Sequence, residues 1–183
     1  MPDGAYVEAL LVDLKQDLPY LQGRSIHSIF IGGGTPSLLG GDELERLMQG
    51  LYQNLSIDKD AEITLETNPG TFEIDKFVRF RGAGINRLSI GVQSFNDQHL
   101  RQLGRIHSSD EATQAIVKAK AVGFDNFNID LMHGLEGQTL KQCLSDVERA
   151  LSFDSTHISF YQLTLEPNTL FAKFPPKLPD DED

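Results

Sequence analysis

Three polar residues, Glu66, Gln93 and Asp130, stand near the carboxyl ends of short apolar segments. Their two carboxylates and one carboxamide supply hydrogen-bond acceptors and donors for a polar ligand. Another apolar segment ends in glycines at residues 32–34, where no Cβ prevents a ligand from approaching the backbone. The bare N–H groups there can donate to an anionic or carbonyl group. If these segments are parallel strands, their carboxyl ends meet and form one ligand site.

Each of these features also has a purely structural interpretation. Consecutive glycines can form a tight turn after a strand, and Glu66 and Asp130 can be hydrogen-bonded filler on a sheet. Their equivalent positions beside a glycine-rich loop favour the ligand site. Glu62 and Arg87 lie nearer the starts of their segments and predict a structural ion pair or hydrogen-bonded filler.

Strands and helices alternate along the chain. Apolar residues in strand-like runs predict strands at residues 27–31, 61–67, 86–93, 127–132 and 157–163. Helical periodicity predicts helices at residues 4–21, 42–55, 73–81, 97–103, 108–122 and 139–151. Strands that are joined through helices imply right-handed crossovers and a parallel sheet.

Local residues predict where several helices begin, end and face the core. Capping pairs are predicted at three helix starts, by Asp42 with Glu45, Ser108 with Glu111, and Thr139 with Gln142. Pro19 predicts an end or a kink of the first helix near residue 18. The last helix has an apolar stripe made of Leu140, Cys143, Leu144, Val147 and Leu151. Cys143 is therefore expected to be a buried core thiol.

The alternation within the strands predicts the fold class. Three strands have one apolar face, which helices must cover, and one polar face, which carries Glu66, Gln93 and Asp130. An open sheet with a wet face and a curved, partial (β/α) barrel both satisfy this pattern. We favour an α/β fold with a partial barrel of about five parallel strands, because ligand sites gather at the carboxyl ends of such strands. Residues 1–174 are expected to form it, and residues 175–183 an acidic, proline-rich tail or continuation.

The composition excludes several classes of partner and site. The 183 residues include 27 acidic and 16 basic ones, with a net charge of −11, so no basic surface recruits a nucleic acid. Cys143 is the only cysteine, and the five histidines have no metal-ligand spacing, so no metal site is expected. No apolar stretch approaches the roughly 20 residues of a membrane span, and no signal peptide is evident. We therefore expect a cytoplasmic protein that is not an integral membrane protein.

Six segments of the chain carry a family resemblance: IFIGGGTPSLL, EITLETNPG, NRLSIGVQSFN, LGRIH, NIDLMHGL and YQLTLEPNTLF. In this order they resemble the radical S-adenosylmethionine proteins related to oxygen-independent coproporphyrinogen III oxidase. Residues 104–107, 131–135 and 161–164 are most similar to the heme chaperone branch of that family. The resemblance extends over about residues 5–181.

The resemblance implies S-adenosylmethionine as the cofactor and heme or porphyrin as a partner. The residues implied to bind the cofactor are Gly33, Gly34, Thr35, Glu66, Gln93, Arg105 and Asp130. The glycines and Thr35 would hold its methionine amino group and backbone, and Glu66 its amino acid or ribose part. Gln93 and Asp130 would reach the ribose, and Arg105 the carboxylate.

The family also has a first strand that carries a CxxxCxxC loop, whose thiolates bind a 4Fe–4S cluster. The present sequence starts after that point, so the resemblance implies an internal part of a longer parent that alone holds the cluster. We expect this chain to be inactive by itself, with no catalytic residue of its own. Without the first strand, the strand at residues 27–31 is expected to be an exposed sheet edge.

Two other functions remain open from the sequence. The chain can be a binding module that holds heme through His107 or His133 as an axial ligand, since both lie near strand or loop ends. It can also be an unrelated (β/α) enzyme that uses Glu66 and Asp130 as an acid and base pair.

Overall fold

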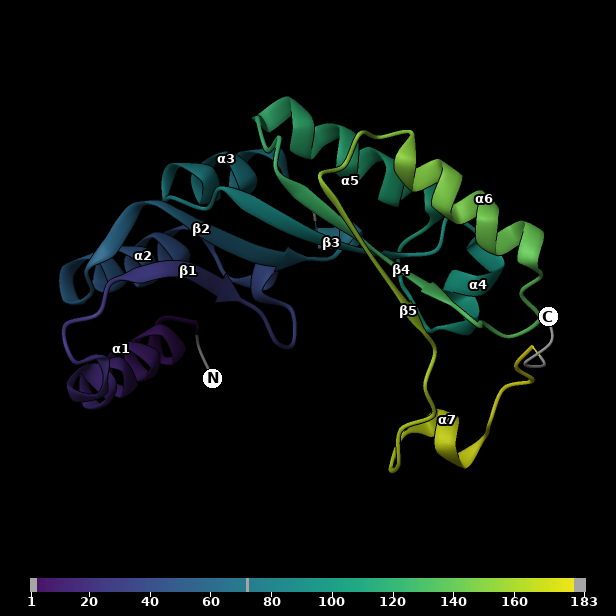
Figure 1. Ribbon diagram of the computed structural model, residues 1–183, viewed down its shortest axis with the longest axis horizontal. Helices are drawn as coiled ribbons and strands as arrows, with labels where there is room; N and C mark the ends of the chain where they lie inside the picture. The colour runs from purple at the N-terminus through teal and green to yellow at the C-terminus, as the bar shows by residue number, and fades with distance from the viewer. Residues whose placement is uncertain (1–2, 72, 180–183) are drawn as a thin grey trace.

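The computed structural model describes residues 3–71 and 73–179. Five strands form one sheet: β1 (Ile26–Ile31), β2 (Ile57–Thr67), β3 (Arg87–Gln93), β4 (Phe127–His133) and β5 (His157–Gln162). They lie in the order β1-β2-β3-β4-β5, and every neighbouring pair is parallel. Successive crossovers in one direction curl a sheet towards a barrel. Figure 1 shows the resulting arch, which confirms the predicted partial (β/α) barrel.

The helices are mainly those that the sequence predicts. They are α1 (Asp3–Leu21), α2 (Gly41–Asn54), α3 (Ile74–Gly82), α4 (Asp97–Gln102), α5 (Ser109–Val122), α6 (Leu140–Leu151) and the unpredicted α7 (Leu170–Lys173). Short 3₁₀ turns occur at Pro36–Leu38 and Pro69–Thr71. In Figure 1, α3, α5 and α6 follow the outer side of the arch, while α1 and α7 lie below its two ends.

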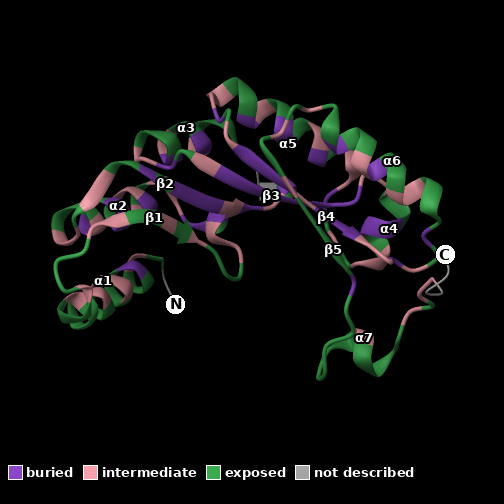
Figure 2. Cartoon of the chain, viewed as in Figure 1, coloured by how far each residue is buried: buried purple, intermediate pink, exposed green. Residues whose placement is uncertain are grey.

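The core lies between the outer face of the sheet and the helices that cover it, among them α2, α3 and α5. Its largest buried side chains include Leu65, Leu88, Ile90, Phe127, Phe77, Phe80, Phe124 and Ile116. In Figure 2 the buried positions concentrate in β2, β3 and β4, whereas β1 and β5 at the ends of the sheet are more exposed. The prediction that the strand at residues 27–31 is a sheet edge is therefore confirmed.

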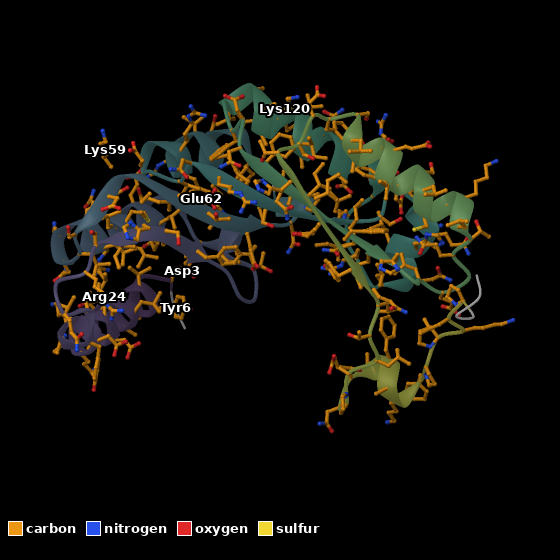
Figure 3. All side chains as sticks on the ribbon, in the orientation of Figure 1. Asp3, Tyr6, Arg24, Lys59, Glu62 and Lys120 are labelled. Carbon is orange, nitrogen blue, oxygen red and sulfur yellow. The ribbon has the colours of Figure 1, made fainter. Side chains whose placement is uncertain are left out.

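The predicted ion pair between Glu62 and Arg87 is also present. Arg87 Nη1 lies 3.5 Å from Glu62 Oε1, and Asn126 Nδ2 donates to Glu62 Oε2 at 3.2 Å. Glu62, which is labelled in Figure 3, thus links the middle of β2 to the start of β3 and to the loop before β4. These charges belong to the sheet and not to the ligand site.

Two of the three predicted capping pairs are confirmed. Ser108 with Glu111 and Thr139 with Gln142 form complete capping boxes at the starts of α5 and α6. The cap predicted at Asp42 is wrong, since α2 begins at Gly41 without a side-chain cap. Asp42 forms an ion pair with Arg79 of α3 instead, because a guanidinium attracts the carboxylate more strongly than a backbone N–H.

The prediction that the first helix ends near residue 18 is also wrong, whereas the alternative, a kink at Pro19, stays a prediction. Pro19 lies inside α1, which continues to Leu21. A proline interrupts a helix by removing a backbone donor and by clashing with the preceding turn. Pro19 lies only two residues before the end of α1, so little regular helix follows it.

Only part of the predicted apolar stripe of α6 faces the core, since Val147 packs against it and the leucines do not. Leu140, Leu144 and Leu151 are exposed, and the buried residues of α6 are Asp146 and Ala150. The Asp146 carboxylate accepts hydrogen bonds from the loop after β3, and these bonds set which side of the helix turns inward. Consequently Cys143 is only half-buried, although burial still raises the pKa of its thiol.

Residues 175–179 contain no helix or strand, but part of this segment packs on the domain. Leu178 contacts a small apolar cluster of Met132, Leu135 and Leu163, and Gly137 N donates to Lys177 O at 3.3 Å. Residues 180–183 lie outside the described part of the chain, so the boundary at residue 174 stays a prediction. None of the helices within residues 3–71 and 73–179 is long and apolar enough to cross a lipid bilayer.

Candidate functional site

A cavity of about 200 Å³ opens on the polar face of the sheet, where β2 and β3 end. Six of the seven residues implied to bind a cofactor line it: Gly34, Thr35, Glu66, Gln93, Arg105 and Asp130. The seventh, Gly33, does not line the cavity but is linked to it through Glu66, because Gly33 N donates to Glu66 Oε2 at 3.0 Å. The fold thus brings all seven residues together, from segments that are far apart in the sequence.

The glycine loop after β1 and the Glu66 carboxylate form one unit. Gly33 has a φ of +107°, a backbone conformation that favours glycine. A Cβ on Gly32 would lie 2.6 Å from the Phe30 ring and 3.1 Å from the Glu66 carboxyl carbon. The loop therefore needs glycine for two reasons, one conformational and one steric. Gly33 N binds Oε2, and Oε1 of Glu66 has no protein hydrogen-bond partner among the described residues, which leaves it to a ligand.

Asp130 is held in place by its neighbours on the polar face. Ser89 Oγ donates to its Oδ2 at 3.1 Å, and Asn128 Nδ2 donates to its Oδ1 at 2.6 Å. Burial raises the pKa of the Asp130 carboxyl, and the nearby charge of Glu66 adds to this, while the hydrogen bonds oppose it. Asp130 lies mid-strand in β4 and not at its end, so it lies deeper along the sheet than Gln93.

Gln93 is the last residue of β3, as predicted, and its backbone is unusual. Its φ is +70°, which places a residue other than glycine in the left-handed region. Its side chain is almost fully buried, with 4% exposed, and its Oε1 accepts a hydrogen bond from the Tyr161 hydroxyl at 2.7 Å. Backbone strain of this kind persists where the surroundings hold the residue in place.

Arg105 supplies the positive charge of the cavity. It follows α4, and within the described residues its guanidinium forms no ion pair with a carboxylate. An arginine without such a partner suits bidentate contact with an anionic ligand group. The cavity therefore presents two carboxylates, one guanidinium and the backbone of the glycine loop, which matches a zwitterionic ligand better than an apolar one.

The sequence analysis did not single out several other residues that line the cavity. These are Pro36, Thr67, Asn68, Ser89, Gly91 and Tyr161. The alternation of faces could have found Ser89 and Gly91, which share a face with Gln93. The same rule applied to β5 could have found Tyr161.

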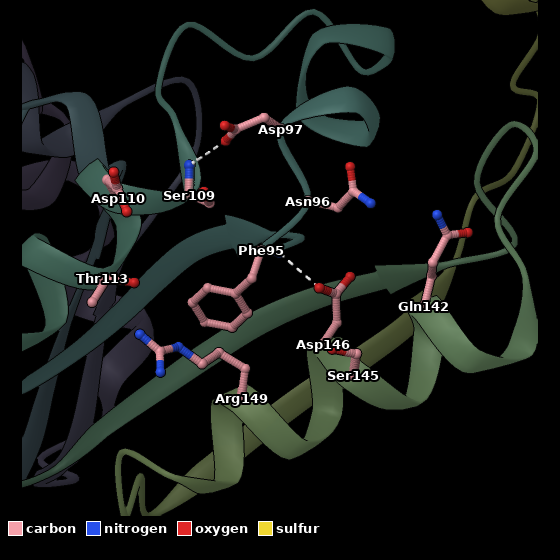
Figure 4. Close-up of a pocket in the computed structure, with 10 residues that line it drawn as sticks. All are labelled: Phe95, Asn96, Asp97, Ser109, Asp110, Thr113, Gln142, Ser145, Asp146 and Arg149. Carbon is pink, nitrogen blue, oxygen red and sulfur yellow. Dashed lines mark hydrogen bonds between the residues drawn. The ribbon is translucent and has the colours of Figure 1, made fainter.

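A second cavity, of about 460 Å³, lies on the other side of the loop after β3 (Figure 4). The Asp146 side chain points from α6 towards the backbone of Phe95 in this view. Asp146 is 3% exposed and accepts hydrogen bonds from Ser94 Oγ at 2.6 Å and Phe95 N at 2.8 Å. Burial raises the pKa of its carboxyl, and these bonds oppose the shift.

The second cavity is larger than the first, but two of the three carboxylates that line it, those of Asp97 and Asp146, already accept hydrogen bonds. Asp97 accepts from Ser109 N at 2.8 Å, in addition to the bonds of Asp146. We therefore assign Asp146 a structural role: it anchors the segment that directly follows Gln93, from behind the first cavity.

His107 is packed in the interior, which disfavours it as an axial heme ligand. It is 5% exposed, and its Nε2 donates to the Val92 carbonyl at 3.1 Å. His133 lies beside Phe160, with ring centroids 4.6 Å apart. Both carboxylates of the acid and base hypothesis, Glu66 and Asp130, line the cavity, but each already accepts hydrogen bonds from the protein.

Acidification is expected to destabilise the fold through His107. Burial lowers the pKa of His107, the charge of Arg105 adds to this, and the bond to Val92 and the charge of Glu111 oppose it. With a folded pKa below the unfolded value, only the unfolded state gains a proton as the pH first falls below about 6.5. Stability is therefore lost on acidification.

The test compares the free energies of unfolding of the wild type and His107→Gln at about pH 7.5 and about pH 5.5. The loss between the two pH values should be smaller in the variant, by up to about 1 kcal/mol. His99, Asp130 and Asp146 titrate in both proteins, so their contributions cancel in this comparison. Equal losses in the two proteins would contradict the prediction.

An apolar groove of about 510 Å³ adjoins the first cavity along the free edge of β1. It lies between α1 and β1, and its walls include Leu10, Ile29 and Phe30. Asp3 and Tyr6 of α1 contribute to the same groove, and both are labelled in Figure 3. The groove and the first cavity share the end of the glycine loop, at Gly34, Thr35 and Pro36.

Known proteins resemble the chain over its full length. The heme chaperone HemW of Escherichia coli (strain K12) is 52% identical over 182 residues, which is 100% of this chain and 48% of that protein. HemW of Haemophilus influenzae is 49% identical over 186 residues, with 100% and 49% covered. The chain therefore spans about half the length of these curated relatives.

A solved structure resembles the fold closely. The coproporphyrinogen III oxidase HemN from Escherichia coli, described as a radical SAM enzyme, superimposes with a TM-score of 0.87 and 30% sequence identity. The match covers 98% of this chain and 42% of that one. The family model of the radical SAM superfamily matches residues 3–150, which is most of the sequence. The chain therefore belongs to the radical SAM superfamily.

Proposed function

We propose that this chain forms the S-adenosylmethionine-binding part of a HemW-like heme chaperone. The observation that carries the proposal is the single cavity that gathers the glycine loop, Glu66, Gln93, Arg105 and Asp130. The high identity to HemW over the whole chain supports the choice of branch, and the heme partner is proposed for the longer protein on that basis.

The residues of the cavity fit the chemistry of this ligand. Its amino group suits Glu66 Oε1, its carboxylate suits the Arg105 guanidinium, and its ribose hydroxyls suit the polar groups of Gln93 and Asp130. Thr67 Oγ1, on the wall of the cavity, is buried and has no hydrogen-bond partner within the described residues. A buried hydroxyl without a partner is costly, and a bound polar ligand would satisfy it.

An iron–sulfur cluster does not fit the residues of this chain. Such clusters are held by cysteine thiolates. Cys143, the only cysteine in the sequence, lies on α6 at the outer side of the arch. We therefore assign to the residues of the first cavity the binding and orientation of the ligand, whose sulfonium group is the reactive part.

The proposal is tested by titrating the chain with S-adenosylmethionine and with 5′-methylthioadenosine, which lacks the amino acid carboxylate. We expect weak but measurable binding of both by NMR. Arg105→Ala should weaken S-adenosylmethionine binding by about tenfold, because a charge-assisted bond is lost, and leave 5′-methylthioadenosine binding unchanged.

Arg101→Ala, an exposed arginine on the neighbouring α4, is the matched control and should affect neither ligand. Absence of binding to the wild type would overturn the proposal. An equal loss for both ligands in Arg105→Ala would overturn the assigned role of Arg105.

A further inference from the structure

Tyr161 reaches from the edge strand β5 to the last residue of β3. In the sheet it pairs with Met132 of β4, while Gln93 pairs with Leu131 of the same strand. Its hydroxyl therefore crosses above β4 to donate to Gln93 Oε1 at 2.7 Å. Both side chains line the first cavity.

This hydrogen bond determines which end of the Gln93 carboxamide faces the cavity. Because Oε1 accepts from Tyr161, the Nε2 amino group points the other way, towards Gly91. A Cβ on Gly91 would lie 3.0 Å from Gln93 Nε2 and 3.1 Å from Asn68 Oδ1, so the amino group and this acceptor both lie beside Gly91. The arrangement gives the cavity a donor at this position.

Two contacts hold Gln93 in its left-handed backbone conformation. Asp146 anchors the next two residues, Ser94 and Phe95, from the outer side of the sheet. Tyr161 holds the side chain from the inner side. A left-handed residue other than glycine costs about 1–3 kcal/mol, so it persists only where surrounding contacts determine it.

The Tyr161 hydroxyl is a reliable donor at neutral pH. Burial raises its pKa above the ordinary tyrosine value, and the negative charge of Asp130 adds to this. Arg105 and the bond to Gln93 oppose the shift, and the net direction is upward. The hydroxyl therefore stays protonated at neutral pH and can donate.

We propose that Tyr161 is a positioning residue, whose hydroxyl locks the Gln93 carboxamide so that its amino group donates to an acceptor oxygen of the bound ligand. A sugar hydroxyl is an oxygen of this kind. The identity of the ligand rests on the proposed function, whereas the lock between Tyr161 and Gln93 does not.

The lock is tested without any ligand, on the full chain. In the wild type, the two side-chain amide protons of Gln93 should give separate, well-resolved NMR resonances in fixed environments. Tyr161→Phe removes one hydroxyl and keeps the ring, so it should shift these resonances towards the positions of exposed glutamine amides. Tyr20→Phe, at an exposed position on α1, is the matched control and should leave them unchanged.

The effect on the ligand is tested with a double-mutant cycle, using S-adenosylmethionine as the probe. Tyr161→Phe should weaken binding by about fivefold in the wild-type background, because the amide can then turn its oxygen towards the ligand. In a Gln93→Ala background the same change should have no further effect, because the residue through which Tyr161 acts is gone.

The outcomes separate the two proposals. Unchanged Gln93 resonances in Tyr161→Phe would overturn the lock, whatever the ligand. A Tyr161→Phe effect on binding that persists in the Gln93→Ala background would show that Tyr161 acts on the ligand by another route, and would overturn the positioning role. Absence of S-adenosylmethionine binding to the wild type would overturn the proposed function, while the resonances would still decide the lock.

Discussion

Replacing Asp146 by alanine is expected to lower the free energy of unfolding by about 3 kcal/mol. The carboxylate is buried and accepts hydrogen bonds from Ser94 Oγ and Phe95 N. Alanine leaves these donors without their partner, and a donor that is buried and unpaired costs about 1–3 kcal/mol. The removed carboxyl group also leaves a cavity, which adds to the loss.

Urea denaturation of the wild type and Asp146→Ala measures this loss. Ser145→Ala, the preceding and exposed residue of α6, is the matched control and should change stability little. Asp146→Asn keeps one acceptor oxygen and should fall between the two. A loss below about 1 kcal/mol in Asp146→Ala would show that the loop after β3 does not depend on this anchor.

Gly33→Ala is expected to cost about 1–3 kcal/mol of stability, because the φ of +107° at this position strains any residue with a Cβ. A steric clash does not contribute, since a Cβ built at Gly33 meets no atom within 4 Å. The same change should displace the Gly33 N–H from Glu66 and weaken S-adenosylmethionine binding by about tenfold.

Gly34→Ala is the matched control for this prediction. Gly34 is the next residue of the same loop, it lies outside the glycine-specific φ region, and a Cβ there also meets open space. The free energy of unfolding of Gly34→Ala should stay within about 1 kcal/mol of the wild type. Alanine fits this backbone without strain, and it only restricts the conformations of the unfolded chain. Thermal unfolding of the two variants side by side separates backbone strain from side-chain volume. Equal losses would refute the strain argument.

The sequence by itself determined the order and type of the five strands and of helices α1–α6, and most of the candidate site. Three of the strands alternate apolar and polar residues, and the capping boxes at Ser108 and Thr139 are local patterns. Glu66 and Gln93 could be predicted because side chains alternate along a strand and parallel strands end at a common edge. These patterns can be recognised from residues that are close together in the sequence. The roles of the seven cofactor residues remain predictions, although the fold gathers them.

Only the tertiary structure decided the contacts between distant segments. Asp42 forms an ion pair with Arg79 and does not cap its own helix. The side of α6 that faces inward carries Asp146, which is hydrogen-bonded to Phe95 N, and not the leucines. The lock of Tyr161 on Gln93 joins residues that are 68 positions apart. A side chain pairs with the partner that the fold brings nearest, and the energy of that contact outweighs local propensity. The glycine loop depends on both kinds of information. Its glycines predict a turn from the local sequence, whereas its hydrogen bond to Glu66 depends on the tertiary structure and makes the loop part of the candidate site.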